Sequence, residues 1–345
     1  MSGADTLRLC PVVSDYPLYD QLLYDLMTGD KPRDAAFRAA LAKLANGKTV
    51  VDIGTGRDVN WARASVEAGA RKVFAIEEMP DTFRLAQQAV RQLGLENRIT
   101  VISGLSINVE LPERVDLCVS EIIGCIASSE GVVSVLKDAR ERFLKPEGRI
   151  IPWRCVTRLA LVELPEQFRL PVAFDAEAQM RAAKIFEWVG HRFDLRVAIE
   201  GRIDPSWFIS SVDDAEVIDL EYPAFPAARK FELRVEKPGK VDGMLAWINL
   251  WCLPEGECVD ARDANTTAWM PVWLPVFYPG IELRPGDRVS GVWTPSLSSD
   301  GVHPDYSLLA EVHRDRAPPT AYELHLPHHA PRYRCSEFHR RLFPG

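Results

Sequence analysis

The sequence predicts an α/β domain with a parallel sheet, followed by a domain of antiparallel β-strands. Between residues 49 and 152, short apolar segments alternate with helical segments, which is typical of a parallel sheet covered by helices. After residue 152, strand-like segments follow one another with Pro and Gly between them, and this favours an antiparallel barrel or sandwich. The length of 345 residues suits two domains.

The elements of the first half follow in a regular order. An apolar stripe at helical spacing runs through residues 16–46, and Gly29 and Pro32 interrupt it. Beyond it we expect strands at 49–54, 72–77, 99–103, 115–121 and 149–152, and helices at 64–70, 81–95 and 131–144.

The second half contains one long helical segment, at 176–189, among strand-like segments at 157–164, 230–236, 243–253, 287–293 and 307–312. The chain is therefore expected to divide into N-terminal helices (1–46), an α/β domain (47–152), a β-barrel domain (153–327) and a basic C-terminal tail (328–345).

Composition narrows the functional classes. The net charge of −8 argues against a nucleic-acid surface, which needs clustered Lys and Arg; it favours a cationic substrate, or it simply keeps the protein in solution. Seven scattered cysteines without a C-x-x-C pair argue against a disulfide framework or a zinc cluster, so we expect no metal and a reducing cytoplasm. We expect no membrane span, because no apolar run is long enough.

A glycine-containing turn follows the first strand and opens a helix. Gly54 and Gly56 permit close approach to a ligand, although an ordinary turn has similar glycines. Glu77, at the end of the second strand, suits two ribose hydroxyls. Asp58 would repel a pyrophosphate, which disfavours NAD and favours S-adenosylmethionine, a cofactor with a sulfonium cation and no phosphate. Asp52 is a further acid near the cationic end of that ligand, or it caps the turn.

Two glutamates lie on one short segment, residues 115–131. A buried strand delivers Glu121 at its carboxyl end, where ligands bind in open α/β sheets, and Glu130 follows nine positions later. A guanidinium is planar, has a pKa above about 12 and pairs with carboxylates in bidentate geometry. Two glutamates can hold its charge on part of the group and leave one nitrogen facing a methyl donor. The alternative is a solvated loop with two surface acids.

The segment S-E-I-I-G-C-I-A-S-S-E resembles the double-glutamate loop of the protein arginine methyltransferases, with Glu121 and Glu130 at its two acidic positions. Upstream, Y-D-L-M-T-G-D-K-P-R resembles the helix that folds over the cofactor. The resemblance covers residues 16–315 and implies a Rossmann-like S-adenosylmethionine-dependent methyltransferase domain followed by a β-barrel domain. It implies that Tyr24 and Met27 line the substrate site and that Arg33 meets the cofactor carboxylate, although Met27 could be a core residue and Arg33 a surface one.

The sequence departs from the family at two places. The family's threonine–histidine–tryptophan loop is placed at residues 271–279, where Trp273 keeps the tryptophan and the histidine is missing. This segment, without the histidine, is more similar to that of the subclass that forms symmetric dimethylarginine. On this match Trp273 stacks on the guanidinium, and the alternative is a core aromatic. The usual adenine-binding acid is also absent, and Ser106 and Ile107 occupy that cofactor-binding stretch.

The compact chain offers no extra recognition module, and its basic tail could meet a small carboxylate. Free L-arginine, as used by bacterial relatives in natural-product biosynthesis, is therefore the favoured substrate over arginine in a protein. A catalytically silent scaffold is the alternative from another class, and both retained glutamates argue against it. Family members dimerise through an arm in the β domain, so residues 165–205 are expected to form such an arm in a homodimer, which light scattering would test.

Overall fold

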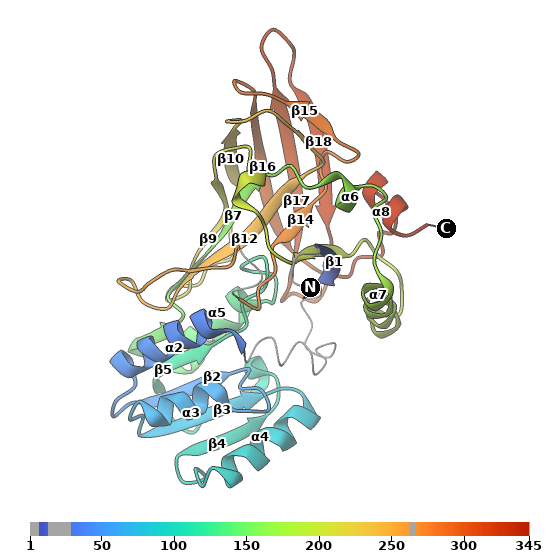
Figure 1. Ribbon diagram of the computed structural model, residues 1–345. Helices are drawn as coiled ribbons and strands as arrows, with labels where there is room; N and C mark the ends of the chain where they lie inside the picture. The colour runs from blue at the N-terminus through green and yellow to red at the C-terminus, as the bar shows by residue number, and fades with distance from the viewer. Residues whose placement is uncertain (1–6, 13–28, 263–266, 345) are drawn as a thin grey trace, which may run out of the picture.

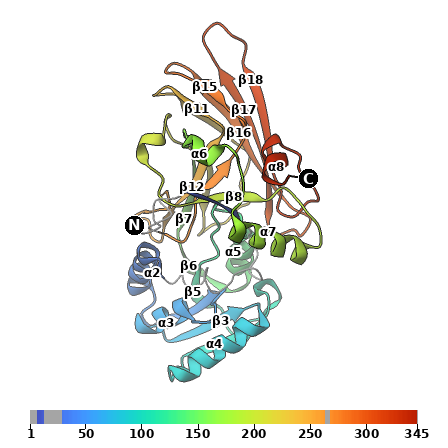
Figure 2. The ribbon, with the colours of Figure 1, turned by 45° about the vertical axis from the view of Figure 1, so that its right-hand side comes forward.

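The computed structural model describes residues 7–12, 29–262 and 267–344, and it divides into two lobes (Figures 1 and 2). The lower lobe is a five-stranded parallel sheet with the order β4-β3-β2-β5-β6. Its strands are β2 (Thr49–Ile53), β3 (Lys72–Glu77), β4 (Ile99–Ser103), β5 (Val115–Ser120) and β6 (Leu144–Ile151). The helices are α2 (Lys31–Leu44), α3 (Asn60–Glu67), α4 (Pro80–Gln92) and α5 (Val132–Arg142), with a 3-10 turn, η2 (Ser106–Asn108).

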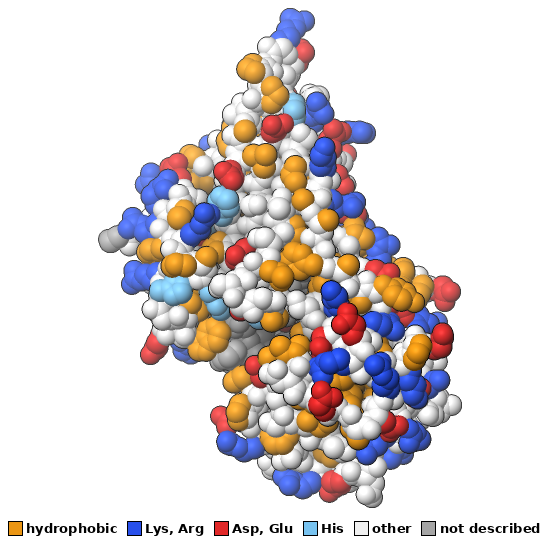
Figure 3. All heavy atoms as spheres, turned by 180° about the vertical axis from the view of Figure 1, so that it is seen from behind, with side chains coloured by type: hydrophobic (Ala, Val, Ile, Leu, Met, Phe, Trp, Pro, Cys, Tyr) orange, Lys and Arg blue, Asp and Glu red, His pale blue; other side chains and the backbone are white. Residues whose placement is uncertain are grey.

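This lobe confirms the expected parallel sheet covered by helices. The two largest differences in boundaries are at the starts of α3 and β6. Helix α3 begins at Asn60, because the glycine turn leads directly into it, rather than at residue 64. Strand β6 begins at Leu144, rather than at residue 149. On the face seen in Figure 3, acidic and basic side chains of this lobe are interspersed.

The upper lobe is built from antiparallel sheets. One sheet has the order β1-β8-β14-β12-β7-β9 with β13 beside β12, a second has the order β10-β16-β17-β18, and β11 pairs with β15. The first comprises β1 (Arg8–Val12), β7 (Arg154–Leu161), β8 (Arg196–Glu200), β9 (Asp213–Asp219), β12 (Met244–Trp251), β13 (Val259–Asp260) and β14 (Val272–Leu274). The others comprise β10 (Arg229–Arg234), β11 (Gly239–Val241), β15 (Ile281–Leu283), β16 (Arg288–Leu297), β17 (Pro304–His313) and β18 (Thr320–Leu326). Closure of these sheets into a barrel stays a prediction.

Helical segments lie beside the upper lobe (Figure 2). These are α6 (Glu166–Arg169), α7 (Ala176–Val189), η3 (Pro205–Trp207) and α8 (Glu337–Leu342). The apolar side of α7 packs in one hydrophobic cluster with Phe338 and Leu342 of α8. The C-terminal tail is thus docked through the buried face of a short helix, and not only laid over the surface. None of the described helices is long and apolar enough to cross a membrane.

Candidate active site

The glycine turn lies at the carboxyl end of β2, against the loop that carries the glutamates. Gly54 and Gly56 have φ of +74° and +68°, values that favour glycine. The amide of Gly54 donates to the carbonyl of Ile76, at 3.0 Å. A Cβ atom on Gly54 would lie 3.1 Å from Cγ2 of Ile122. The turn and the residue after Glu121 are therefore in close contact, and a larger side chain at Gly54 would push them apart.

Glu77 is held at the end of β3 with its carboxylate toward this turn. One oxygen accepts from the amide of Gly56 and the other from the amide of Met79, each at 3.0 Å. The side chain is buried, and this burial raises its pKa while the two amides oppose the rise. A rigid carboxylate at this edge suits a vicinal diol, so Glu77 fits the ribose of an adenosyl cofactor.

Asp52 serves the turn itself. Its Oδ2 accepts from the Thr55 hydroxyl at 2.6 Å and from the Ala62 amide at 2.9 Å, and the residue is fully buried. The structure therefore favours the capping role for Asp52 over direct contact with a ligand. Burial raises the pKa of Asp52 to about 7.

The raised pKa of Asp52 predicts a pH-dependent stability. The folded protein keeps the proton between about pH 4 and 7 while the unfolded chain loses it, so the free energy of unfolding falls as pH rises through that window, by on the order of 4 kcal/mol. Asp52→Asn should remove this fall, because an amide oxygen can still accept from Thr55 and Ala62. Thermal melts of both proteins at pH 5 and 8 measure the difference; equal pH dependence in the two would contradict the assignment.

The adenine-side stretch lies at the same sheet edge, since the amide of Gly104 donates to the carbonyl of Glu77 at 2.9 Å. Ser106 is buried, and its carbonyl accepts from Arg142 at 2.8 Å. Ile107 is 38% exposed. An apolar side chain thus stands where the sequence comparison expects an acid, and it can contribute only packing to a ligand.

The side chain of Glu121 is buried against the guanidinium of Arg33. It forms an ion pair with Arg33 of α2, and each side chain is only 7% exposed. Burial raises the pKa of Glu121, although the Arg33 cation opposes this rise. The site therefore has the depth and charge that a buried guanidinium–carboxylate pair requires.

Glu130 follows Glu121 on the same loop, nine positions later. The thiol of Cys125, midway along the loop, has its pKa raised to about 12 by burial and by the fields of both glutamates, with Glu130 the stronger. Both carboxylates are therefore near one side chain. Convergence of Glu121 and Glu130 on one guanidinium stays a prediction.

The far end of the loop is anchored to the upper lobe. Ser128 donates to the carboxylate of Glu216 on β9 at 2.7 Å, and its oxygen lies 2.7 Å from the hydroxyl of Tyr306 on β17. Thr157 on β7 donates to the same carboxylate at 3.0 Å and accepts from the amide of Ala127 at 3.0 Å. All of these contacts are buried. This network fixes the backbone just before Glu130.

A tryptophan from the upper lobe closes the other side. The indole of Trp269 donates to the carbonyl of Ile123 at 2.7 Å, and the guanidinium of Arg33 lies 5.6 Å from the centre of its ring. The amide of Ala268 donates to Asp30 at 2.8 Å, and Asp30 also caps α2 through the amide of Arg33. One segment of the upper lobe is thus joined to both α2 and the glutamate loop.

Comparisons with known proteins agree with this geometry. No family model matches the chain. An "Arginine N(omega)-methyltransferase" of Streptomyces achromogenes subsp. streptozoticus is 28% identical over 270 residues, which cover 76% of this chain and 73% of that protein. Protein arginine N-methyltransferases of plants and animals also match. PRMT10 of Oryza sativa subsp. japonica is 26% identical over 302 residues, which cover 78% of this chain and 79% of that protein. The enzyme of Xenopus tropicalis is 35% identical over 136 residues, which cover about two fifths of each chain.

Two solved structures share the fold. Protein arginine methyltransferase 10 of Arabidopsis thaliana superposes with a TM-score of 0.72 at 20% identity, covering 90% of this chain and 98% of that one. The Trypanosoma brucei PRMT1 enzyme-prozyme heterotetrameric complex with AdoHcy gives 0.73 at 18% identity, covering 90% and 100%. The resemblance to the arginine methyltransferases is confirmed. The parallel lobe thus has the Rossmann-like fold of the methyltransferase domain in those structures, and it is called the methyltransferase domain below for that likeness.

The structure corrects the expectation for Trp273. This residue lies on β14 between Leu245 and Val197, and it is buried in the cluster that contains α7 and α8. Trp269, four residues earlier, is the tryptophan at the glutamate loop. The triplet Thr267-Ala268-Trp269 keeps the first and third residues of the arginine methyltransferase loop, so it is the signal that could have located the site, with Ala268 at the histidine position.

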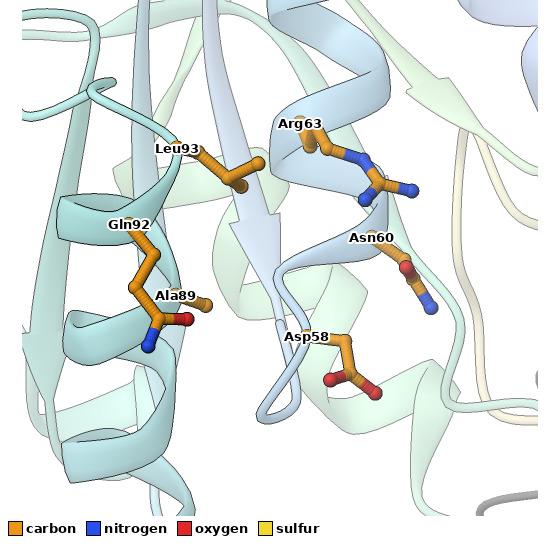
Figure 4. A pocket seen from close by; sticks show the side chains of 6 residues that line it. All are labelled: Asp58, Asn60, Arg63, Ala89, Gln92 and Leu93. Atoms are coloured by element: carbon orange, nitrogen blue, oxygen red, sulfur yellow. The ribbon is translucent and has the colours of Figure 1, made fainter.

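Tyr24 and Met27, which the resemblance places at the substrate, lie outside the described residues. A separate cavity of about 300 Å³ lies between α3 and α4 (Figure 4). It is lined by Asp58, Asn60, Arg63, Ala89, Gln92 and Leu93. None of the residues assigned to the arginine methyltransferase site lines this cavity, so it is not part of the proposed cofactor site.

Proposed function

We propose that this protein transfers a methyl group from S-adenosylmethionine to a guanidino nitrogen of arginine. The observation that carries this function is the buried Glu121, which pairs with a guanidinium in a site completed by Glu130 and Trp269. When bound, the cofactor supplies an electrophilic sulfonium methyl. Glu77 would hold its ribose, the Gly54–Gly56 turn would face it, and Arg33 would meet its carboxylate.

The residues of this chain act by orientation and charge. Two carboxylates hold the planar cation of the substrate and concentrate its charge away from one nitrogen, which can then attack the methyl carbon. Trp269 lies beside Arg33 and Ile123, so it lines the proposed substrate site next to Glu121 and excludes water from it. With Ala268 at the histidine position, the proton that leaves the guanidinium is taken up by a carboxylate or by solvent after the methyl has arrived.

Free L-arginine is the proposed substrate, and arginine in a protein is the alternative. The relative from Streptomyces, named for arginine Nω methylation, matches over 76% of this chain, and a protein arginine N-methyltransferase of Oryza sativa matches over 78%, so the extent of the match favours neither substrate. The proposal of free arginine rests instead on the basic C-terminal tail, which offers positive charge to the α-carboxylate of a small substrate. A homodimer is also proposed: α7, within the expected arm, leaves Met180 and Trp188 62% and 45% exposed. Symmetric dimethylation and a role in natural-product biosynthesis remain proposals.

The substrate proposal is tested by incubating the full chain with methyl-labelled cofactor and either L-arginine or an arginine-rich peptide. We expect label in arginine, with the peptide labelled at less than about a tenth of that rate. Agmatine, which lacks the α-carboxylate, is the matched control and should be a poorer substrate. Label only in the peptide would overturn free arginine as substrate, and no label in any guanidine would overturn the function itself.

A further inference from the structure

A carboxylate and two imidazoles meet at the turn between β16 and β17, and none of the three belongs to the residues assigned to the arginine methyltransferase site. Asp300 and His303 lie on this turn, and His328 follows the end of β18. One potential ligand atom from each residue lies within 4.8 Å of the other two.

The two oxygens of Asp300 have different tasks. Oδ1 accepts from the Ser298 hydroxyl and from the amides of Val302 and His303, at 2.8 to 2.9 Å, and so it holds the turn. Oδ2 faces the imidazoles, 2.7 Å from Nδ1 of His303 and 3.4 Å from Nε2 of His328. One oxygen of an anchored carboxylate is thus directed at two histidine nitrogens.

His328 is held in place more firmly than His303. Its side chain is 4% exposed, and its amide donates to Asp305 at 2.5 Å. The rings of His303 and His328 are stacked, with centres 4.3 Å apart, and His329 stacks on the other face of His328 at 3.8 Å. The His303 side chain is 19% exposed and can turn more freely.

This donor set is that of a zinc-type site. Two imidazoles and one carboxylate suit Zn²⁺ and its neighbours, and ligand atoms about 2.0–2.2 Å from a tetrahedral ion are separated by about 3.3 Å. The 3.4 Å distance from Asp300 to His328 fits this value. The 2.7 Å distance to His303 is that of a hydrogen bond, so this ring must move outward.

We propose that Asp300, His303 and His328 bind one divalent transition-metal ion, with Zn²⁺ as the reference ion. The ion enters between the carboxylate and the rings, and the imidazole of His303 turns out of the stack so that its in-plane lone pair meets the metal. The expectation of no metal rested on cysteine spacing alone, and therefore did not consider these histidines.

The site lies directly behind the loop that carries Glu130. A Cβ atom on Gly131 would lie 2.6 Å from Cγ1 of Val302, and Ser134 of α5 donates to the carbonyl of Val302 at 3.2 Å. A bound ion would join this turn to the end of β18 and so stiffen the support of Glu130. This consequence rests on the proposed function, whereas metal binding does not.

The test is a calorimetric titration of the chelator-treated full chain with ZnCl₂, and the visible spectrum after addition of CoCl₂. We expect one equivalent of Zn²⁺ and a tetrahedral Co²⁺ absorption band. His328→Ala and Asp300→Asn should weaken Zn²⁺ binding by at least about 10-fold; the asparagine can still accept the turn's hydrogen bonds through its oxygen, so the fold is retained. Circular dichroism checks that retention.

His325→Ala is the matched control, because His325 is a more exposed histidine on β18 paired with Glu323 at 3.1 Å. Its Zn²⁺ affinity should equal that of the unmodified chain. No binding at micromolar Zn²⁺, or binding that His325→Ala weakens as much as His328→Ala does, would overturn the site. Neither result would contradict the proposed methyl transfer, because the titration measures metal binding and not activity.

Discussion

Glu121→Gln and Glu130→Gln are each expected to lower kcat about 10²- to 10³-fold, a loss comparable to removal of a transition-state electrostatic contact. Glutamine keeps the shape of the side chain but loses the charge that balances the guanidinium. Glu121 pairs with Arg33, so its replacement should also alter the position of α2 and with it the proposed cofactor site. Glu130→Gln should reduce kcat with little change in cofactor affinity.

The measurement combines methyl-transfer kinetics with calorimetric binding of S-adenosylmethionine. Glu141→Gln, a change at an exposed acid of α5, is the control and should retain kcat within about twofold. Cofactor affinity separates the two roles: it should fall with Glu121→Gln and hold with Glu130→Gln. Full turnover in either glutamine variant would show that Glu121 and Glu130 do not bind the guanidinium of the substrate together, and would contradict the proposed mechanism.

Glu216→Ala should lower kcat about 100-fold although Glu216 lies in the other lobe. Its carboxylate accepts hydrogen bonds from the hydroxyls of Ser128 and Thr157. Alanine leaves these two buried hydroxyls without that acceptor, at a cost of about 1–3 kcal/mol each. The backbone before Glu130 then shifts, and a displacement of about 1 Å can reduce turnover 100-fold. Because Glu216 acts through the loop, it is a positioning residue.

A split of kinetic constants distinguishes positioning from general loss of stability. Glu216→Ala should reduce kcat and raise the KM for arginine at temperatures well below its Tm, while the Kd of the cofactor, which is bound at the turn, stays within about twofold. Glu216→Gln retains one acceptor oxygen and should recover about half of the lost activation free energy. Glu232→Gln, at an exposed acid of β10, serves as the control. An unchanged kcat in Glu216→Ala would exclude the anchoring role.

Local patterns were sufficient for the methyltransferase domain. The apolar strands alternate with helices at short range, so their parallel order follows from connections that the chain itself limits. Gly54, Gly56 and Glu77 lie at consecutive strand ends, and strand ends meet at one edge of a parallel sheet. Glu121 and Glu130 are nine residues apart on one loop, which limits how far apart they can lie; that they converge stays a prediction.

Residues from distant segments could not be found in this way. Trp269 reaches a carbonyl 146 positions away in the sequence, Ser128 reaches a carboxylate 88 positions away, and neither partner carries a local pattern. With several tryptophans nearby in the chain, the sequence favoured Trp273, and only packing showed that β14 turns it toward α7 and α8.

The sequence by itself therefore determined the parallel sheet, the glycine turn and the pair of glutamates, because each depends on periodicity or on spacing within one segment. The tertiary structure decided which tryptophan meets Arg33, how Glu216 holds the loop, and that Asp300, His303 and His328 share one place. Each of these contacts joins residues from separate helices, loops or strands, so it depends on how those elements pack and not on a pattern within one segment.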